Sequence, residues 1–144
     1  MERILLKSKI HRATVTAADV HYQGSISIGP SLLQAADIVE FEQVQVYNVT
    51  TGARFTTYAI SGEDEGQIQI NGAAAHLARP GDRVIVASYA SYGEKEIAGH
   101  KPLLVYVSDR NRIERVATRF GRKETRAEAA LTRAAQKRPV KVGV

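Results

Sequence analysis

Several segments of the sequence alternate polar and apolar residues with a period of two, which limits the folds that the chain can adopt. The alternating segments are residues 25–28, 39–42, 44–46 and 67–70. This period is typical of β-strands that bury one face and expose the other. The sequence therefore predicts several short strands.

Two further segments, residues 83–87 and 103–107, are richer in β-forming residues and predict strands buried on both faces. Short helices are expected at residues 31–36, where the preceding Pro30 suits a first helical turn, and at residues 73–77. Many short strands with minor helices predict a mainly β fold, a compact β-barrel in a single domain, rather than a βαβ fold.

The net charge of +5 is concentrated at the C-terminal end of the chain. Residues 117–144 hold eight basic and two acidic residues, whereas residues 1–116 hold 12 basic and 13 acidic ones and are nearly neutral. We expect residues 1–116 to form the folded domain. We expect residues 117–144 to be a flexible or transiently helical basic tail, because their apolar face is mostly alanine.

Several function classes are disfavoured by composition. The chain has no cysteine, and its four histidines show no metal-ligand spacing, so we expect no disulfide and no metal site. It has no apolar run long enough to cross a bilayer and no secretory signal at its start, so we expect a cytoplasmic protein without a membrane partner. A small β-barrel module that binds nucleic acid through the basic tail is the alternative, but the domain is near neutral and has few aromatic residues.

The dipeptide Gly24-Ser25 is the first candidate site. Gly-Ser is most often an ordinary turn. A serine hydroxyl can also attack the preceding carbonyl when the backbone is distorted, and a glycine before it permits that distortion. The resulting ester can eliminate to dehydroalanine, which hydrolyses to a pyruvoyl group and ammonia. That reaction needs a nearby base and a donor for the oxyanion.

Cationic and hydroxyl side chains form the second candidate site. Lys9, His11 and nearby Arg12 lie on one expected strand, either as an anion site or as a solvated strand edge. On another expected strand, alternation puts Arg54 and Tyr58 on one face and Thr57 on the other. A twist or bulge would be needed for these three to converge.

A third candidate lies at residues 71–74, where Asn71 and Gly72 form a turn into a short helix that starts with Ala73 and Ala74. The free backbone N–H groups of a helix N-terminus can bind a carboxylate, and small residues let a ligand come close. A helix start chosen only for packing explains these residues equally well.

The order of these segments resembles the family of aspartate 1-decarboxylases. The similar blocks are residues 9–26, 47–60, 71–76 and 81–87, and together the resemblance covers about residues 3–107. Residues 117–144 match nothing in the family pattern.

The resemblance implies a double-psi β-barrel and a homotetramer with active sites between subunits. It implies self-cleavage between Gly24 and Ser25 into chains of residues 1–24 and 25–144, with Ser25 becoming a pyruvoyl cofactor. The implied reaction converts L-aspartate to β-alanine and CO2 for pantothenate and coenzyme A synthesis. A maturation partner is a possibility that the sequence leaves open, and so is a relative that keeps the fold without being processed.

The family pattern also implies a role for each matching residue. Thr57 would assist self-processing and bind substrate, and Tyr58 would donate the proton after decarboxylation. Lys9 and Arg54 would bind the substrate carboxylates, a task that suits two cations. The residues that would line the pocket or offer backbone contacts are His11, Tyr22, Asn71, Gly72, Ala73 and Ala74.

Overall fold

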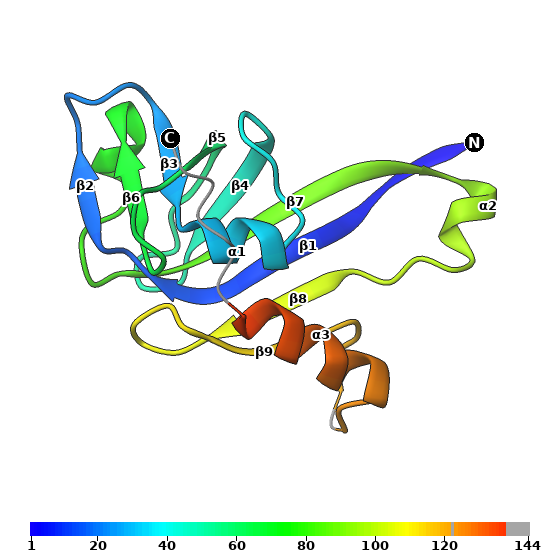
Figure 1. The fold of residues 1–144 in the computed structure, drawn as a ribbon. Helices are drawn as coiled ribbons and strands as arrows, with labels where there is room; N and C mark the ends of the chain where they lie inside the picture. The colour runs from blue at the N-terminus through cyan, green and yellow to red at the C-terminus, as the bar shows by residue number, and fades with distance from the viewer. Residues whose placement is uncertain (122, 138–144) are drawn as a thin grey trace.

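The computed structural model describes residues 1–121 and 123–137, and over these residues nine strands form one sheet (Figure 1). The strands are β1 (Glu2–Thr14), β2 (Ala17–Asp19), β3 (Ser25–Ile28), β4 (Gln43–Asn48), β5 (Arg54–Ser61), β6 (Ile68–Asn71), β7 (Arg83–Gly93), β8 (Leu103–Val107) and β9 (Ile113–Ala117). The helices are α1 (Pro30–Ala35), the 3₁₀ helix η1 (Gly72–His76), α2 (Glu94–Ile97) and α3 (Arg126–Gln136). No helix in this part of the chain has the length and apolar character needed to span a membrane.

The sheet curls into a small barrel, because two strands that lie far apart in its strand order, β1 and β2, are separated by only two residues of the chain. The strand order is β2-β6-β3-β5-β4-β7-β1-β8-β9. The seven strands from β2 to β1 therefore form a row whose two end strands are connected by residues 15 and 16. At the junction, the Thr16 N–H donates to the Ile68 carbonyl at 2.8 Å and the Val15 N–H donates to Asp82 at 2.9 Å. The β8–β9 hairpin adds to the outside of β1.

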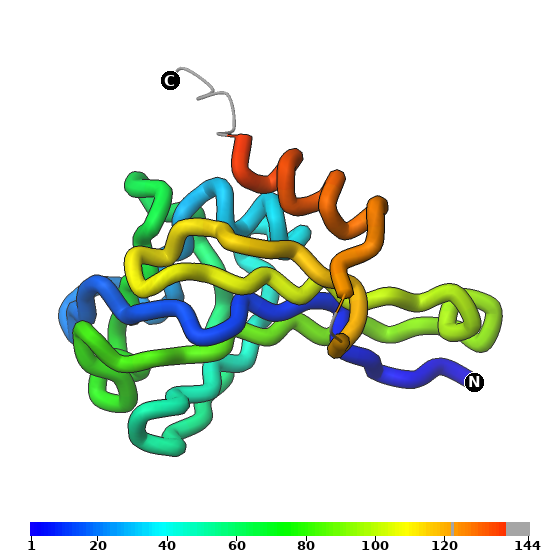
Figure 2. The backbone as a smooth tube through the Cα atoms, turned by 90° about the horizontal axis from the view of Figure 1, so that it is seen from below, coloured from blue at the N-terminus to red at the C-terminus, as the bar shows by residue number. Residues whose placement is uncertain are grey.

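Apolar residues of alternating positions fill the barrel, as period-two strands require. Those without exposed surface include Ile10, Ile26, Ile28, Val46, Ile68, Ile70, Val84 and Val86. Beyond the barrel, β1 and β7 continue as a long antiparallel pair toward the N-terminus and α2 (Figures 1 and 2).

The mainly β fold with short helices predicted from the sequence is confirmed. Strands cover the predicted segments except residues 39–42, where the prediction is wrong and the chain makes a turn with Phe41 at φ 69°. The alternation there is misleading because the polar residue faces inward: Glu42 accepts hydrogen bonds from Lys7 and Ser88, while Phe41 is 73% exposed.

The C-terminal segment also differs from our expectation, because residues 126–136 form the helix α3, which lies against β9 and α1 (Figure 2). Its anchors are polar as well as apolar. The Val116 N–H donates to Thr132 Oγ at 2.9 Å, the Glu128 side chain is buried, and Ala135 packs on the core. A small alanine face permits this close approach. Residues 138–144 of the expected tail lie outside the described residues.

Candidate functional site

Ser25, the first residue of β3, lies buried between two hydrogen-bond partners. Its hydroxyl donates to the Gln23 carbonyl at 3.1 Å and accepts from the Asn71 side-chain amide at 3.0 Å. Asn71 is fully buried, lies opposite Ser25 in the antiparallel β3–β6 register, and also donates to Ser27 Oγ at 3.0 Å. The position of the serine oxygen is therefore set by groups on both sides.

Gly72 packs directly on the backbone that precedes Ser25. It adopts φ +70°, a conformation that favours glycine, and a Cβ atom there would lie 2.6 Å from the Gly24 Cα atom. It would also lie 3.2 Å from the carbonyl oxygen of Tyr22, whose side chain is half-exposed. The Gly24-Ser25 peptide is thus held against a backbone that has no room for a side chain.

The β5 strand is the parallel neighbour of β3, the strand that begins at Ser25. In the parallel β3–β5 register Ile26 pairs with Ala59 and Ser27 with Ile60. Continued toward the start of β3, this register would put Ser25 beside Tyr58 and Gly24 beside Thr57. By alternation, Tyr58 then shares a face of the sheet with Ser25, while Thr57 shares the opposite face with the buried Ala59.

No bulge brings Arg54, Thr57 and Tyr58 to one face, because the β4–β5 pairing runs without a register shift. Arg54 and Tyr58 share the outer face of the barrel, and Thr57 remains on the other face. The Arg54 guanidinium stacks on the Tyr47 ring at 4.1 Å from its centroid. The Tyr47 and Tyr89 hydroxyls are 2.8 Å apart, and this hydrogen bond, with burial, raises the pKa of Tyr89.

Lys9 and His11 lie on the outer face of β1, on the far side of β4 and β7. The register connects Lys9 to Ala87, Ala87 to Gln45 and Gln45 to Thr56, so one row of outward-facing residues crosses β1, β7, β4 and β5. Burial lowers the pKa of Lys9. Burial and the charges of Lys9 and Arg12 lower the pKa of His11, which keeps its imidazole neutral at pH 7.

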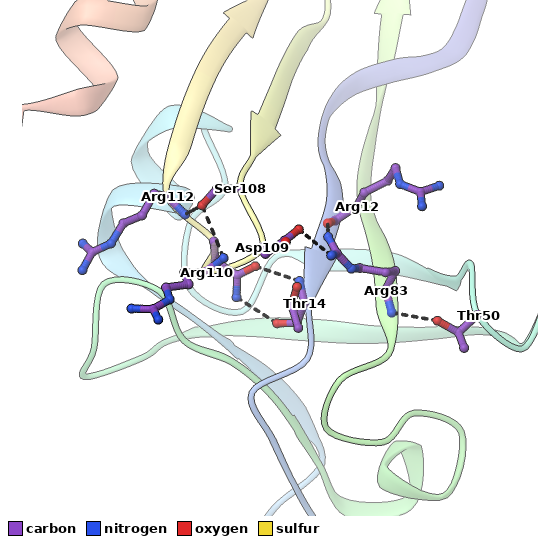
Figure 3. A network of polar contacts seen from close by, with 9 residues as sticks. Arg12, Thr14, Thr50, Arg83, Ser108, Asp109, Arg110 and Arg112 are labelled. Carbon is purple, nitrogen blue, oxygen red and sulfur yellow. Dashed lines mark hydrogen bonds and ion pairs between the residues drawn. The ribbon is translucent and has the colours of Figure 1, made fainter.

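Arg12 leaves this row. It has φ 59° in an irregular part of β1 between Ile10 and Ala13. Its carbonyl accepts a hydrogen bond from Arg83, which also forms an ion pair with Asp109 at 2.5 Å (Figure 3). Arg12 thus belongs to a separate polar network that joins β1, β7 and the β8–β9 turn.

One chain assembles only part of the predicted site. Gly24, Ser25, Asn71 and Gly72 are in contact. Lys9 is four strands from Ser25 in the sheet order, and the two residues share no strand pairing. The exposed Ala73 and half-buried Ala74 follow Gly72 in η1.

Three residues of these regions were not predicted from the sequence. Ser27 shares the amide of Asn71 with Ser25, and its position two residues along the same alternating strand was a usable signal. Tyr89 lies in a groove of about 600 Å³ on the outer face, together with Gln43, the neighbour of Tyr58 across β4 and β5. The Lys9 ammonium group lies over the Phe120 ring, a contact that no local sequence pattern indicates.

Comparison with known proteins shows that the chain is similar to enzymes that decarboxylate aspartate. A family model described as "Aspartate decarboxylase" matches residues 1–114. The chain is 53% identical over 117 residues to an aspartate 1-decarboxylase of Chromobacterium violaceum, covering 81% of this chain and 93% of the relative. It is 58% identical over 114 residues to one of Myxococcus xanthus, covering 78% and 88%. These matches confirm the resemblance inferred from the sequence.

Proposed function

Because the chain belongs to the aspartate decarboxylase family, we propose that it converts L-aspartate to β-alanine and CO2 with a pyruvoyl group made from its own Ser25. The observation that carries the proposal is the buried Ser25 hydroxyl, held by Asn71 beside a glycine-lined backbone. The product would serve pantothenate and coenzyme A synthesis in the cytoplasm. The alternative of a nucleic-acid-binding module has no support in the matches.

The surroundings of Ser25 fit the chemistry of self-cleavage. The hydroxyl oxygen would attack the Gly24 carbonyl carbon, and breakage of the peptide C–N bond would leave an ester. Elimination would release the Gly24 carboxylate and leave dehydroalanine at position 25, which hydrolysis converts to the pyruvoyl group and ammonia. The Asn71 amide, 3.0 Å from the serine oxygen, fixes its direction. Thr57, which the register would put beside Gly24, is suited to donate to the carbonyl oxygen as it gains charge.

Substrate binding follows from charge and shape. A pyruvoyl group would act as the electron acceptor that permits loss of the carboxylate next to the substrate amine. Arg54, stacked on Tyr47, can bind one carboxylate through two parallel hydrogen bonds, and Lys9 supplies a second cation. Tyr58 would return a proton to the carbon that loses CO2. The pocket would be completed by His11 and Tyr22, with backbone contacts from Gly72, Ala73 and Ala74.

The separation between the two groups of residues favours a site shared between subunits. Lys9 and His11 face outward on β1, whereas Ser25 lies across the barrel on β3. A second chain that presents its β1 face would supply the missing cation without moving either strand. This supports the homotetramer that the family resemblance implies.

Intact mass measurement of the denatured protein tests the proposal. We expect two fragments that meet at Gly24/Ser25, the larger with a pyruvoyl mass and a blocked N-terminus. Ser25→Ala should remain a single inactive chain. Ser27→Ala is the matched control, because it loses the same Asn71 contact without losing the nucleophile, and it should still cleave.

Two results would count against the proposal. The first is a wild-type chain that remains whole after long incubation and with cell extract added, since the extract would supply any maturation partner. The second is a Ser25→Ala variant that still decarboxylates aspartate.

A further inference from the structure

The loop that follows β9 brings an aromatic side chain next to Lys9 on β1. The loop between Thr118 and Thr125 carries Phe120, whose ring centroid lies 5.0 Å from the Lys9 ammonium nitrogen. Phe120 is 72% exposed, so burial of its own surface does not explain its position. The loop lies beyond residue 114, where the family match ends.

A single carboxylate holds both ends of this loop. One oxygen of Glu128 accepts the Thr118 N–H at 2.7 Å, and the other accepts the Thr125 N–H at 2.9 Å. These two backbone hydrogen bonds lower the pKa of Glu128 to about 2, so the carboxylate is charged at neutral pH. Glu128 is 1% exposed, so the two ends of the loop are held in place by a buried side chain.

The helix that carries Glu128 is itself attached to the barrel at two places. Thr132 Oγ accepts the Val116 N–H at 2.9 Å, and the Gln136 side chain donates to the Ile113 carbonyl at 3.0 Å. Both partners are in β9, which pairs through β8 with the strand of Lys9. The position of Phe120 relative to Lys9 is thus set by a continuous chain of contacts.

We propose that Phe120 is a positioning residue for Lys9, with its ring face holding the ammonium group ready for a substrate carboxylate. A free lysine side chain samples many rotamers, and restricting them before the substrate arrives lowers the cost of binding. The attraction between an ammonium group and an aromatic face supplies the restriction. This inference depends on the proposed role of Lys9 in binding aspartate.

The test compares Phe120→Leu with Phe120→Tyr in the full-length, self-cleaved protein. Leucine keeps an apolar side chain but has no ring, so we expect the KM for aspartate to rise about threefold to tenfold with kcat within about twofold. Tyrosine keeps the ring face and should restore the wild-type KM. Because Phe120 is exposed, we expect both variants to melt close to the wild type. A Phe120→Leu enzyme with a wild-type KM would overturn the proposal.

A second measurement does not depend on turnover. The rate at which an amine-reactive acetylating reagent modifies Lys9, followed by mass spectrometry, should rise at least about threefold in Phe120→Leu. The exposed Lys101 serves as the internal reference and should not change. An unchanged Lys9 rate would overturn the contact, and a faster rate with an unchanged KM would overturn the positioning role. A wild-type protein that neither cleaves nor decarboxylates would instead be a failure of the proposed function.

Discussion

The Ser25 region and the Lys9–Arg54 region differ in how much of each one chain completes. Around Ser25 the hydrogen-bonded side chains of Ser25, Ser27 and Asn71 are neutral and buried, and they lie on the two neighbouring strands β3 and β6. Around Lys9 and Arg54 the groups are cationic, face outward and lie on strands at opposite edges of a four-strand row. Their direct neighbours are aromatic rings, at 5.0 Å for Lys9 and 4.1 Å for Arg54.

The difference has a physical reason. A neutral hydroxyl can be buried at little cost once it is hydrogen-bonded, and burial keeps its geometry fixed. A buried cation without a counter-charge is far more costly, so it remains at the surface until a carboxylate arrives. Under the proposed function, one chain would therefore preform the self-cleavage site alone, whereas a second subunit and the ligand would complete the substrate site.

The substitution Gly72→Ala should have the largest effect on the Ser25 region, measured as the rate of self-cleavage. The added Cβ atom would lie 2.6 Å from Gly24 Cα, so the peptide must shift, and we expect self-cleavage to slow about a hundredfold or more. Gly52→Ala is the matched control: Gly52 has φ +83° but open space around it, so it should lose roughly 1 kcal/mol of stability and cleave normally. The measurement is the cleaved fraction against time.

Co-assembly of two inactive variants should show whether Ser25 of one chain and Lys9 of another chain form one site. Under the proposed function, Ser25→Ala would lack the cofactor and Lys9→Ala would lack a substrate cation. If each site takes Ser25 from one chain and Lys9 from another, random co-assembly should restore activity at roughly a quarter of the sites. The readout is decarboxylation by the co-expressed, co-purified mixture relative to each variant alone. Recovery no greater than the sum of the two would mean that both residues act within one chain.

A smaller effect should follow from Arg54→Lys, which alters only the substrate region. Lysine cannot make two parallel hydrogen bonds to a carboxylate or stack as a plane on Tyr47. We expect kcat/KM to fall roughly 10-fold to 100-fold from the loss of about 1.5–3 kcal/mol, while cleavage at Ser25 remains complete. Arg3→Lys on the exposed end of β1 is the control and should behave as wild type. Incomplete cleavage in Arg54→Lys would mean that the two regions are coupled.

The smallest effect concerns stability. Because hydrogen bonds lower the pKa of Glu128 from 4.5 to about 2, its charged form stabilises the folded protein above pH 4.5, and this contribution is lost as the pH falls toward 2. Glu128→Gln should lower the free energy of unfolding by roughly 1–3 kcal/mol at pH 7 and flatten the acid dependence of unfolding. The exposed Glu114→Gln is the control. Urea titrations at pH 7 and pH 3 would measure both effects.

Much of the barrel could be predicted from the sequence because period-two alternation reports burial on one face of a strand. The same rule failed at residues 39–42, where Glu42 turns inward to Lys7 and Ser88 through a contact distant in sequence. It also missed the docking of α3, which depends on Glu128 and Thr132 finding backbone N–H groups at and after β9. The pairing of Ser25 with Asn71 needed the β3–β6 register, which no local pattern fixes.

The position of the Gly24–Ser25 bond at the start of β3 has a consequence for refolding. Cleavage there would make residues 1–24 a separate peptide that contains β1 and β2, held by non-covalent contacts that include pairing with β6, β7 and β8. The precursor folds as one chain, but the mature protein, once denatured, would have to find its partner by collision. The yield of refolded mature protein should therefore fall as the protein is diluted. The uncleaved precursor should refold with a yield that depends less on dilution.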